Sequence, residues 1–79
     1  MDEAQIYARL AEIVAEVFDQ DVVPLTSDLR VEDMDGWDSL SHVRFILTIE
    51  KSFKIKFLTS EIGTLETVGD LVAAIKSRV

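Results

Sequence analysis

Cysteine is absent from this chain of 79 residues, proline occurs once (Pro24), and there are only three glycines. Without cysteine the chain has no disulfide framework, no thiolate metal site and no thiol nucleophile of its own. Long apolar runs are also missing, so no segment is expected to span a bilayer. The opening Met1-Asp2-Glu3 lacks the basic and apolar regions of a signal peptide. Together these absences favour a cytoplasmic globular protein.

Bases are few, and the surplus of acids is unevenly distributed. The formal net charge is −7, from 8 Lys and Arg against 15 Asp and Glu. Residues 1–38 hold 11 acids and 2 bases (−9), whereas residues 39–79 hold 4 acids and 6 bases (+2). Such a chain is repelled by nucleic acid and by anionic lipid. We therefore expect protein partners with basic patches.

The length and the apolar pattern predict a single all-α domain, residues 1–79, that acts as a monomer. It is expected to be a small four-helix bundle with three main helices, one short helix and a long first loop. A first helix from about Asp2 to Phe18 buries one stripe at helical spacing: Ile6, Leu10, Ile13, Val14 and Val17.

Residues 19–37 interrupt the helical period and predict a long loop that contains a short helical turn. We expect its apolar residues to hold it against the core: Val22, Val23, Leu25, Leu29, Val31 and Met34. Residues 54–58 alternate like a strand but have no partner strand. A brief helix follows at about residues 59–63, and a capping box from Thr67 to Asp70 opens the last helix. One face of that helix is apolar: Val68, Leu71, Val72, Ile75 and Val79.

The helix between these parts begins at Asp38 or Ser39, both good N-cap residues, and ends at about Phe53. It has two apolar faces. The larger set is expected in the core: Phe45, Ile46, Ile49 and Phe53. The opposite set is Leu40, Val43 and Leu47, which we expect to face water as an interaction strip beside Ser39. In the alternative, a compact bundle buries both faces.

The segment Gly36-Trp37-Asp38-Ser39-Leu40 resembles the attachment motif of acyl and peptidyl carrier proteins. The resemblance extends over essentially the whole chain. It includes Thr26-x-Asp28-Leu29 in the loop, the helical spacing of Phe45, Ile49, Glu50 and Phe53, and the run Glu66-Thr67-Val68-Gly69-Asp70-Leu71. Trp37 before the motif is more similar to free-standing carriers of specialised pathways than to the fatty-acid-synthase type.

The resemblance implies that Ser39 accepts 4′-phosphopantetheine from coenzyme A through a phosphopantetheinyl transferase. The arm then carries acyl groups as thioesters for ligase, synthase and transferase partners. In the family, the residues that match Asp38 and Leu40 help the transferase to dock. A helix N-terminus suits the phosphodiester, because its backbone amides and dipole favour negative charge. Aminoacyl and peptidyl cargo also remain open.

Two positions depart from the family pattern. Lys54 stands where the family commonly has Gly or Asp, which removes the easiest left-handed end for the preceding helix. Arg44 and Lys51 lie in the sector of the apolar strip, where fatty-acid carriers usually present acids. We expect dedicated partners that carry acids opposite this helix, while the acidic loop attracts a basic transferase. In the alternative, Arg44 and Lys51 only pair with nearby acids.

Three other functions are conceivable for this chain. A catalytic set of Ser39, His42 and Asp35 or Asp38 lacks an oxyanion site and a substrate pocket in so short a chain. His42 falls on the core side of its helix, where a partly buried, hydrogen-bonded side chain is expected. An EF-hand at Asp33, Asp35 and Asp38 fails on the position of Gly36. An unmodified helical interaction module shares the fold and is distinguished by modification with coenzyme A.

Overall fold

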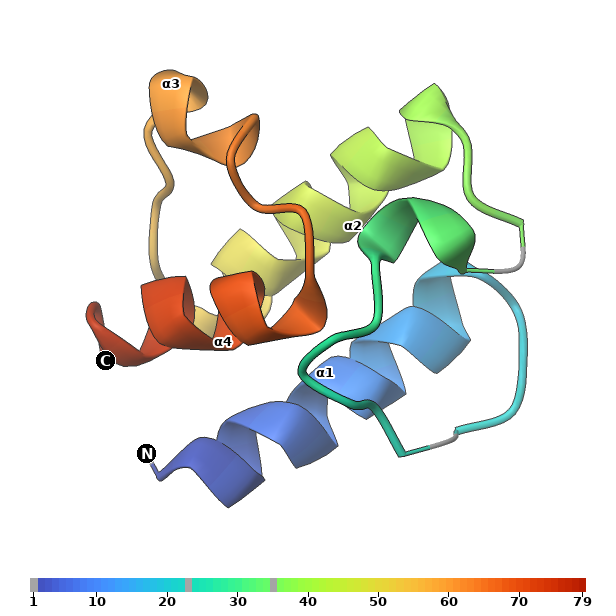
Figure 1. The fold of residues 1–79 in the computed structure, drawn as a ribbon, viewed down its shortest axis with the longest axis horizontal. Helices are drawn as coiled ribbons and strands as arrows, with labels where there is room; N and C mark the ends of the chain where they lie inside the picture. Colours follow the sequence, from blue (N-terminus) through green and yellow to red (C-terminus); the bar gives the residue numbers. More distant parts are fainter. Residues whose placement is uncertain (1, 23, 35) are drawn as a thin grey trace.

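The computed structural model describes residues 2–22, 24–34 and 36–79. Its elements, in chain order, are α1 (Glu3–Val17), the 3₁₀ helix η1 (Val31–Asp33), α2 (Ser39–Phe53), α3 (Thr59–Ile62) and α4 (Val68–Lys76) (Figure 1). The prediction of three main helices and one short helix is confirmed, and η1 is the helical turn expected within the first loop. Within the described ranges no helix is long and apolar enough to cross a membrane.

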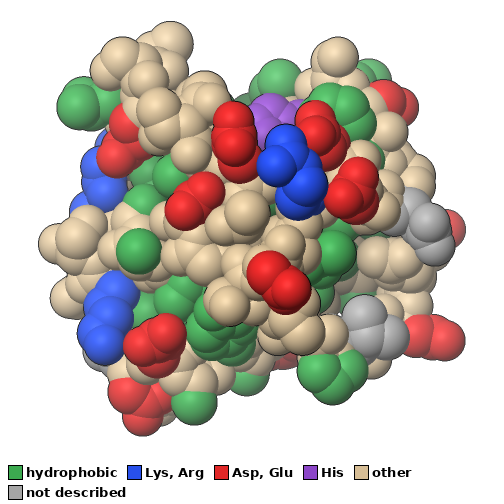
Figure 2. Space-filling view, in the orientation of Figure 1, with side chains coloured by type: hydrophobic (Ala, Val, Ile, Leu, Met, Phe, Trp, Pro, Cys, Tyr) green, Lys and Arg blue, Asp and Glu red, His purple; other side chains and the backbone are tan. Residues whose placement is uncertain are grey.

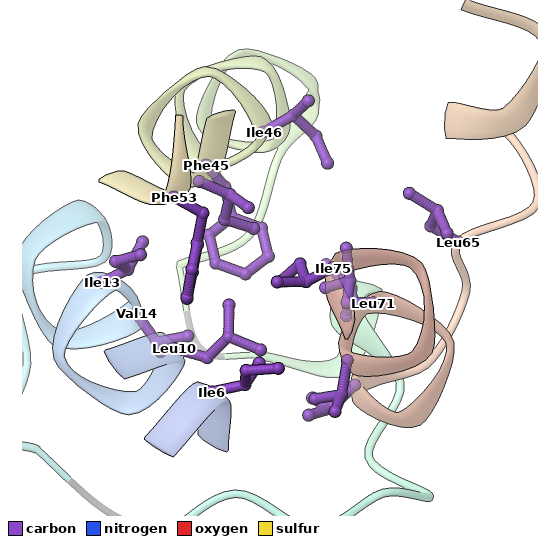
Figure 3. Close-up of a cluster of buried hydrophobic side chains, with 14 of the residues drawn as sticks. Ile6, Leu10, Ile13, Val14, Phe45, Ile46, Phe53, Leu65, Leu71 and Ile75 are labelled. Carbon is purple, nitrogen blue, oxygen red and sulfur yellow. The ribbon is translucent and has the colours of Figure 1, made fainter. Parts of the chain in front are cut away.

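The core lies between the three longer helices. α1 packs against both α2 and α4, and Figure 3 shows Ile6 and Leu10 of α1 pointing toward Phe45 of α2 and Ile75 of α4. The predicted stripe of α1 is buried along its whole length: Ile6, Leu10, Ile13, Val14 and Val17. Helical periodicity therefore identified the core face of α1 correctly.

Side-chain caps fix where two of the helices begin. Asp2 caps α1 by accepting from the Gln5 amide at 2.9 Å, and the Gln5 side chain accepts in return from the Asp2 amide at 3.0 Å. The predicted capping box of α4 is also present, since Thr67 Oγ1 accepts from the Asp70 amide at 3.1 Å and Asp70 accepts from the Thr67 amide. These bonds satisfy amides that have no partner within the helix.

The first loop is held where its backbone bonds to the segment before α4. The Val31 amide donates to Glu66 O at 3.0 Å, and Leu29 O accepts from the Val68 amide at 2.9 Å. Near this stretch the expected contacts form: Val31 and Met34 are buried, and Leu25 and Leu29 are partly buried. Val22 lies before the bonded stretch and is 61% exposed, so its predicted burial is wrong. Val23 lies outside the described residues.

The end of the chain differs from the prediction at Val79. α4 ends at Lys76, so Val79 no longer follows the helical period and is 49% exposed. The other predicted members of this face are buried: Val68, Leu71, Val72 and Ile75.

The missing glycine after Phe53 does not change how α2 ends. Lys54 itself adopts the left-handed conformation, with φ 57° and ψ 47°, and its amide donates to Glu50 O. The segment that follows alternates as expected, with Ile55 and Phe57 buried and Lys56 exposed, without forming a strand.

Candidate functional site

Ser39 is the first residue of α2 and is exposed. Asp38, not Ser39, is the N-cap: its carboxylate accepts from the Ser41 amide at 2.7 Å. Within the described part of the chain no hydrogen bond involves the Ser39 hydroxyl. A serine near the start of a helix often caps it, but here Asp38 is the cap. The Ser39 hydroxyl is therefore free to be modified.

The electrostatics of this corner follow from the helix end. The Ser41 amide, followed by the Ser41 hydroxyl and the Leu40 amide, holds the pKa of the Asp38 carboxyl below its ordinary value. The Ser39 hydroxyl lies at the positive end of a 15-residue helix, where backbone amides and the dipole favour an anion. An exposed hydroxyl in this field fits the phosphodiester of a phosphopantetheine arm.

Gly36 and Trp37 form the turn before Ser39, and each of them is hydrogen-bonded to a residue that follows Ser39. Gly36 has φ 82°, a conformation that suits glycine, and its carbonyl accepts from the Ser41 hydroxyl at 3.4 Å. Trp37 is partly buried, and its indole Nε1 donates to His42 Nδ1 at 3.4 Å, with the ring centroids 5.9 Å apart. The expected hydrogen-bonded, partly buried His42 is thus confirmed.

The side chains of the catalytic alternative are engaged elsewhere. The ring of His42 accepts from Trp37, and the Asp38 carboxylate accepts from the Ser41 amide. Asp35 lies outside the described residues. Where the structure describes the chain, no hydrogen bond joins Ser39 to His42, so the geometry does not assemble a serine nucleophile with a base.

α2 has one buried and one exposed apolar face, as predicted. The buried set is Phe45, Ile46, Ile49 and Phe53. The exposed fractions on the opposite side are 72% for Leu40, 53% for Val43 and 57% for Leu47. The alternative in which both faces are buried is wrong. Arg44 and Lys51 are exposed beside this strip, and neither forms a salt bridge with any described residue.

A small apolar recess lies between α2 and α3, with a volume of about 150 Å³. Its walls are His42, Val43, Ile46, Leu47, Glu50 and Ile62. A second recess of about 200 Å³ shares His42 and Ile62 with the first and extends toward η1. Sequence reasoning missed both recesses, because their walls belong to helices whose approach is set by tertiary packing.

Glu50 also has a role that the sequence pattern did not reveal. Its carboxylate Oε2 accepts from the Phe57 amide at 2.8 Å, and its backbone carbonyl accepts from the Ile55 amide at 3.0 Å. The single acid of α2 therefore holds the chain that leads from α2 to α3.

Comparison with known proteins agrees with this geometry. Residues 8–75 match the family described as phosphopantetheine attachment site. An acyl carrier protein of Borreliella burgdorferi (strain ZS7) is 35% identical over 79 residues, which cover 99% of this chain and 98% of the relative. An acyl carrier protein of Exiguobacterium sp. (strain ATCC BAA-1283 / AT1b) is 33% identical over the full length of both chains.

Solved structures give the same result. The solution structure of the holo acyl carrier protein from Geobacter metallireducens has a TM-score of 0.80 and 40% identity, and covers 89% of this chain and 80% of that chain. The acyl carrier protein of Enterococcus faecalis has a TM-score of 0.78 and 28% identity over the whole of both chains. Sequence, fold and the open serine at the start of α2 agree, and this chain belongs to the acyl carrier protein family, whose prosthetic group is phosphopantetheine.

Proposed function

We propose that Ser39 is the attachment point of 4′-phosphopantetheine and that the chain carries acyl intermediates as thioesters on this arm. The single observation that carries the proposal is the exposed, unengaged hydroxyl of Ser39 at the first position of α2. In the transfer, Ser39 Oγ forms the new bond to phosphorus, and adenosine 3′,5′-bisphosphate leaves from coenzyme A. The hydroxyl proton passes to a base of the transferase. The arm's terminal thiol supplies the sulfur that the chain lacks.

Intact mass after incubation with coenzyme A and a broad phosphopantetheinyl transferase tests this proposal. Ser39→Ala should abolish the mass increment and leave the far-UV helicity nearly unchanged. Ser41→Ala is the matched control, because Ser41 lies in the same helical turn and should leave modification intact. An increment that persists in Ser39→Ala places the attachment elsewhere, and a wild-type chain without any increment is an unmodified interaction module.

The chain works as a substrate of other enzymes and not as a catalyst in this proposal, and it does so as a single cytoplasmic domain. The purified protein should therefore show no thioester hydrolysis of its own. Asp38 and Leu40 contact the transferase, as the family resemblance implies. Turnover that is lost in Ser39→Ala or His42→Ala would revive the catalytic alternative.

The partner enzymes dock on the exposed face of α2, formed by Leu40, Val43 and Leu47 with Arg44 and Lys51 beside them. Positive charge on this face penalises basic enzyme patches, so we place the protein in a specialised pathway and not in housekeeping fatty-acid synthesis. Arg44→Glu with Lys51→Glu should improve loading by fatty-acid ligases at low salt, with a smaller gain at high salt. Equal loading of the wild type and the double variant contradicts this placement.

The cargo is inferred to be a short acyl group. The recess between α2 and α3, at about 150 Å³, is below the range of about 300–1,000 Å³ that is usual for small-molecule pockets. Its apolar walls suit a hydrocarbon segment and not a charged one. Thermal stability of the protein loaded with acyl groups of increasing length should rise and then level off early.

A further inference from the structure

The basic residues of this chain fall into two groups. Of the 8 Lys and Arg, four are in salt bridges: Arg9 with Glu12, Arg30 with Glu32, Lys76 with Glu3, and Arg78 with Glu61. The other four form none with any described residue: Arg44, Lys51, Lys54 and Lys56. All four lie on α2 or on the segment directly after it. As far as the structure describes the chain, the basic side chains without a salt bridge are thus confined to one part of the fold.

This part of the chain also lacks competing acid. Between residues 39 and 60 the only Asp or Glu is Glu50, and its Oε2 already accepts from the Phe57 amide at 2.8 Å. Four cations and one carboxylate give residues 39–60 a net charge of +3. Because the whole chain carries −7, the remaining residues carry −10.

Three of these four cations line a groove at the C-terminal end of α2. Its volume is about 350 Å³, and its walls are Leu47, Glu50, Lys51, Lys54, Ile55 and Lys56. Leu47 is 57% exposed and also belongs to the apolar strip of α2. The groove therefore continues the strip and adds three ammonium groups to an apolar floor.

We propose that this groove, which we call the lysine groove, docks an acidic segment of a partner protein. Carboxylates of that segment meet the ammonium groups of Lys51, Lys54 and Lys56, and an apolar side chain of the segment packs on Leu47. The inference rests on the proposed carrier function, since the partner is an enzyme that the carrier serves. Charge complementarity of this kind speeds the encounter and rejects basic partners.

The rest of the molecule argues against an extended polyanion as the occupant. On the face shown in Figure 2, acidic side chains are spread around η1 and α4. A nucleic acid or an anionic bilayer extends beyond the groove, so it would also meet the net charge of −10 on the rest of the chain and would be repelled by it. A short acidic segment of a protein meets the groove alone.

The position of the groove suits a docking site. Lys51 is twelve residues after Ser39 on the same helix, which places it about 18 Å along the axis at about 1.5 Å per residue. A partner held there leaves Ser39 uncovered and directs it toward the partner's active site. Ser39 and Lys51 lie on the same helix, so a partner docked at the groove has a fixed orientation relative to the attachment point.

NMR titration of the full-length, isotope-labelled holo protein tests the inference. The probe is a capped hexapeptide of glutamates and leucines, and the control probe has lysine in place of each glutamate. At low salt, the acidic peptide should change the amide chemical shifts of the protein mainly at residues 47–56. The lysine peptide should cause no changes there. Lys51→Glu with Lys56→Glu should weaken binding by about tenfold, because two favourable charge contacts become repulsive.

Lys76→Glu is the control variant, since Lys76 is an exposed lysine on α4 outside the groove. This variant should change the affinity for the acidic peptide by less than about twofold, because only a weak long-range charge effect remains. Any of three results would overturn the inference. Lys76→Glu could weaken peptide binding as much as the double variant, or the chemical-shift changes could centre on residues outside 47–56. The protein could also bind phosphatidylglycerol vesicles more strongly than the peptide. The mass increment at Ser39 is measured on the same samples. Normal modification of Ser39 without peptide binding would therefore refute the docking role of the lysine groove, and it would leave the proposed carrier function unaffected.

Discussion

The guanidinium of Arg78 binds the carboxylate of Glu61 and so ties the end of the chain to α3. The same side chain donates to Lys56 O at 3.0 Å and to Ala74 O at 2.9 Å, and it lies 5.2 Å from the centre of the Phe57 ring. Arg78 thus joins α4, α3 and the segment between α2 and α3. α3 has only four residues and none of them is buried, so this contact is a main support for its position.

Arg78→Ala should lower the free energy of unfolding by about 1–2 kcal/mol, because it removes hydrogen bonds to two backbone carbonyls and a cation–π contact. Urea unfolding followed by circular dichroism measures the change. Arg78→Lys is the control: it keeps the charge but cannot bridge several partners, and it should fall between the wild type and Arg78→Ala. An unchanged midpoint in Arg78→Ala would show that α3 does not depend on this contact.

Stability should depend on the ionisation of Glu61. The Leu58 amide, which donates to it at 3.0 Å, and the Arg78 guanidinium hold the pKa of Glu61 below its ordinary value. Because the folded pKa is depressed, the stabilisation is present above the pKa of an unfolded glutamate and is lost as pH falls through the folded pKa. Glu61→Gln keeps the oxygen acceptor and removes the charge. Its melting temperature should be below that of the wild type at neutral pH, and the difference should close in acid; a constant difference at all pH values contradicts the assignment.

Lys54→Gly should stabilise the protein. Lys54 has φ 57°, and a left-handed conformation costs a side-chain-bearing residue roughly 1–2 kcal/mol, against an entropic cost of about 0.5–1 kcal/mol for glycine. We expect a net gain of about 0.5–1 kcal/mol in urea unfolding. Asp19→Gly is the comparison, since Asp19 also has positive φ (53°) but aspartate tolerates this region better. A larger gain at Asp19 than at Lys54 would run against this account.

Gly69→Ala should destabilise the protein. The Gly69 amide donates to Ser27 O at 2.9 Å, and a Cβ built at Gly69 would lie 2.9 Å from the same oxygen. The first loop must shift, at a cost of about 1–3 kcal/mol, which is typical of overpacking. Gly63→Ala is the matched control, because a Cβ at Gly63 meets nothing within 4 Å. It should be neutral or slightly stabilising, and equal losses at both positions would rule out the close approach as the cause.

Much of the fold and of the candidate site was predictable from local patterns. The stripe of α1 and the buried face of α2 follow from helical periodicity, because residues three and four apart share a helix face. Thr67 and Asp70 predicted the start of α4 because a capping box is made within four residues. The role of Ser39 was instead implied by the resemblance to carrier proteins, which extends over essentially the whole chain.

Other features depended on contacts between residues far apart in the chain. Val22 in the first loop and Val79 on the predicted last helix were both expected to be buried, yet they are exposed. Burial there depends on where the backbone of the loop is bonded and on where α4 ends. The sequence indicated that Glu50 was the only acid on its helix, but not that Phe57 would occupy its carboxylate.

The sequence by itself determined the helices, their caps and most of the core faces, since these follow from backbone bonds and side-chain spacing within about four residues. The tertiary structure decided which charges far apart in the chain are paired. Arg78 reaches Glu61 across 17 residues. Lys51, Lys54 and Lys56 line one groove together with Glu50, whose carboxylate accepts from the Phe57 amide, and they form no salt bridge with any described residue. Side-chain pairing requires atoms to come within a few ångströms, and only the packed fold sets those distances.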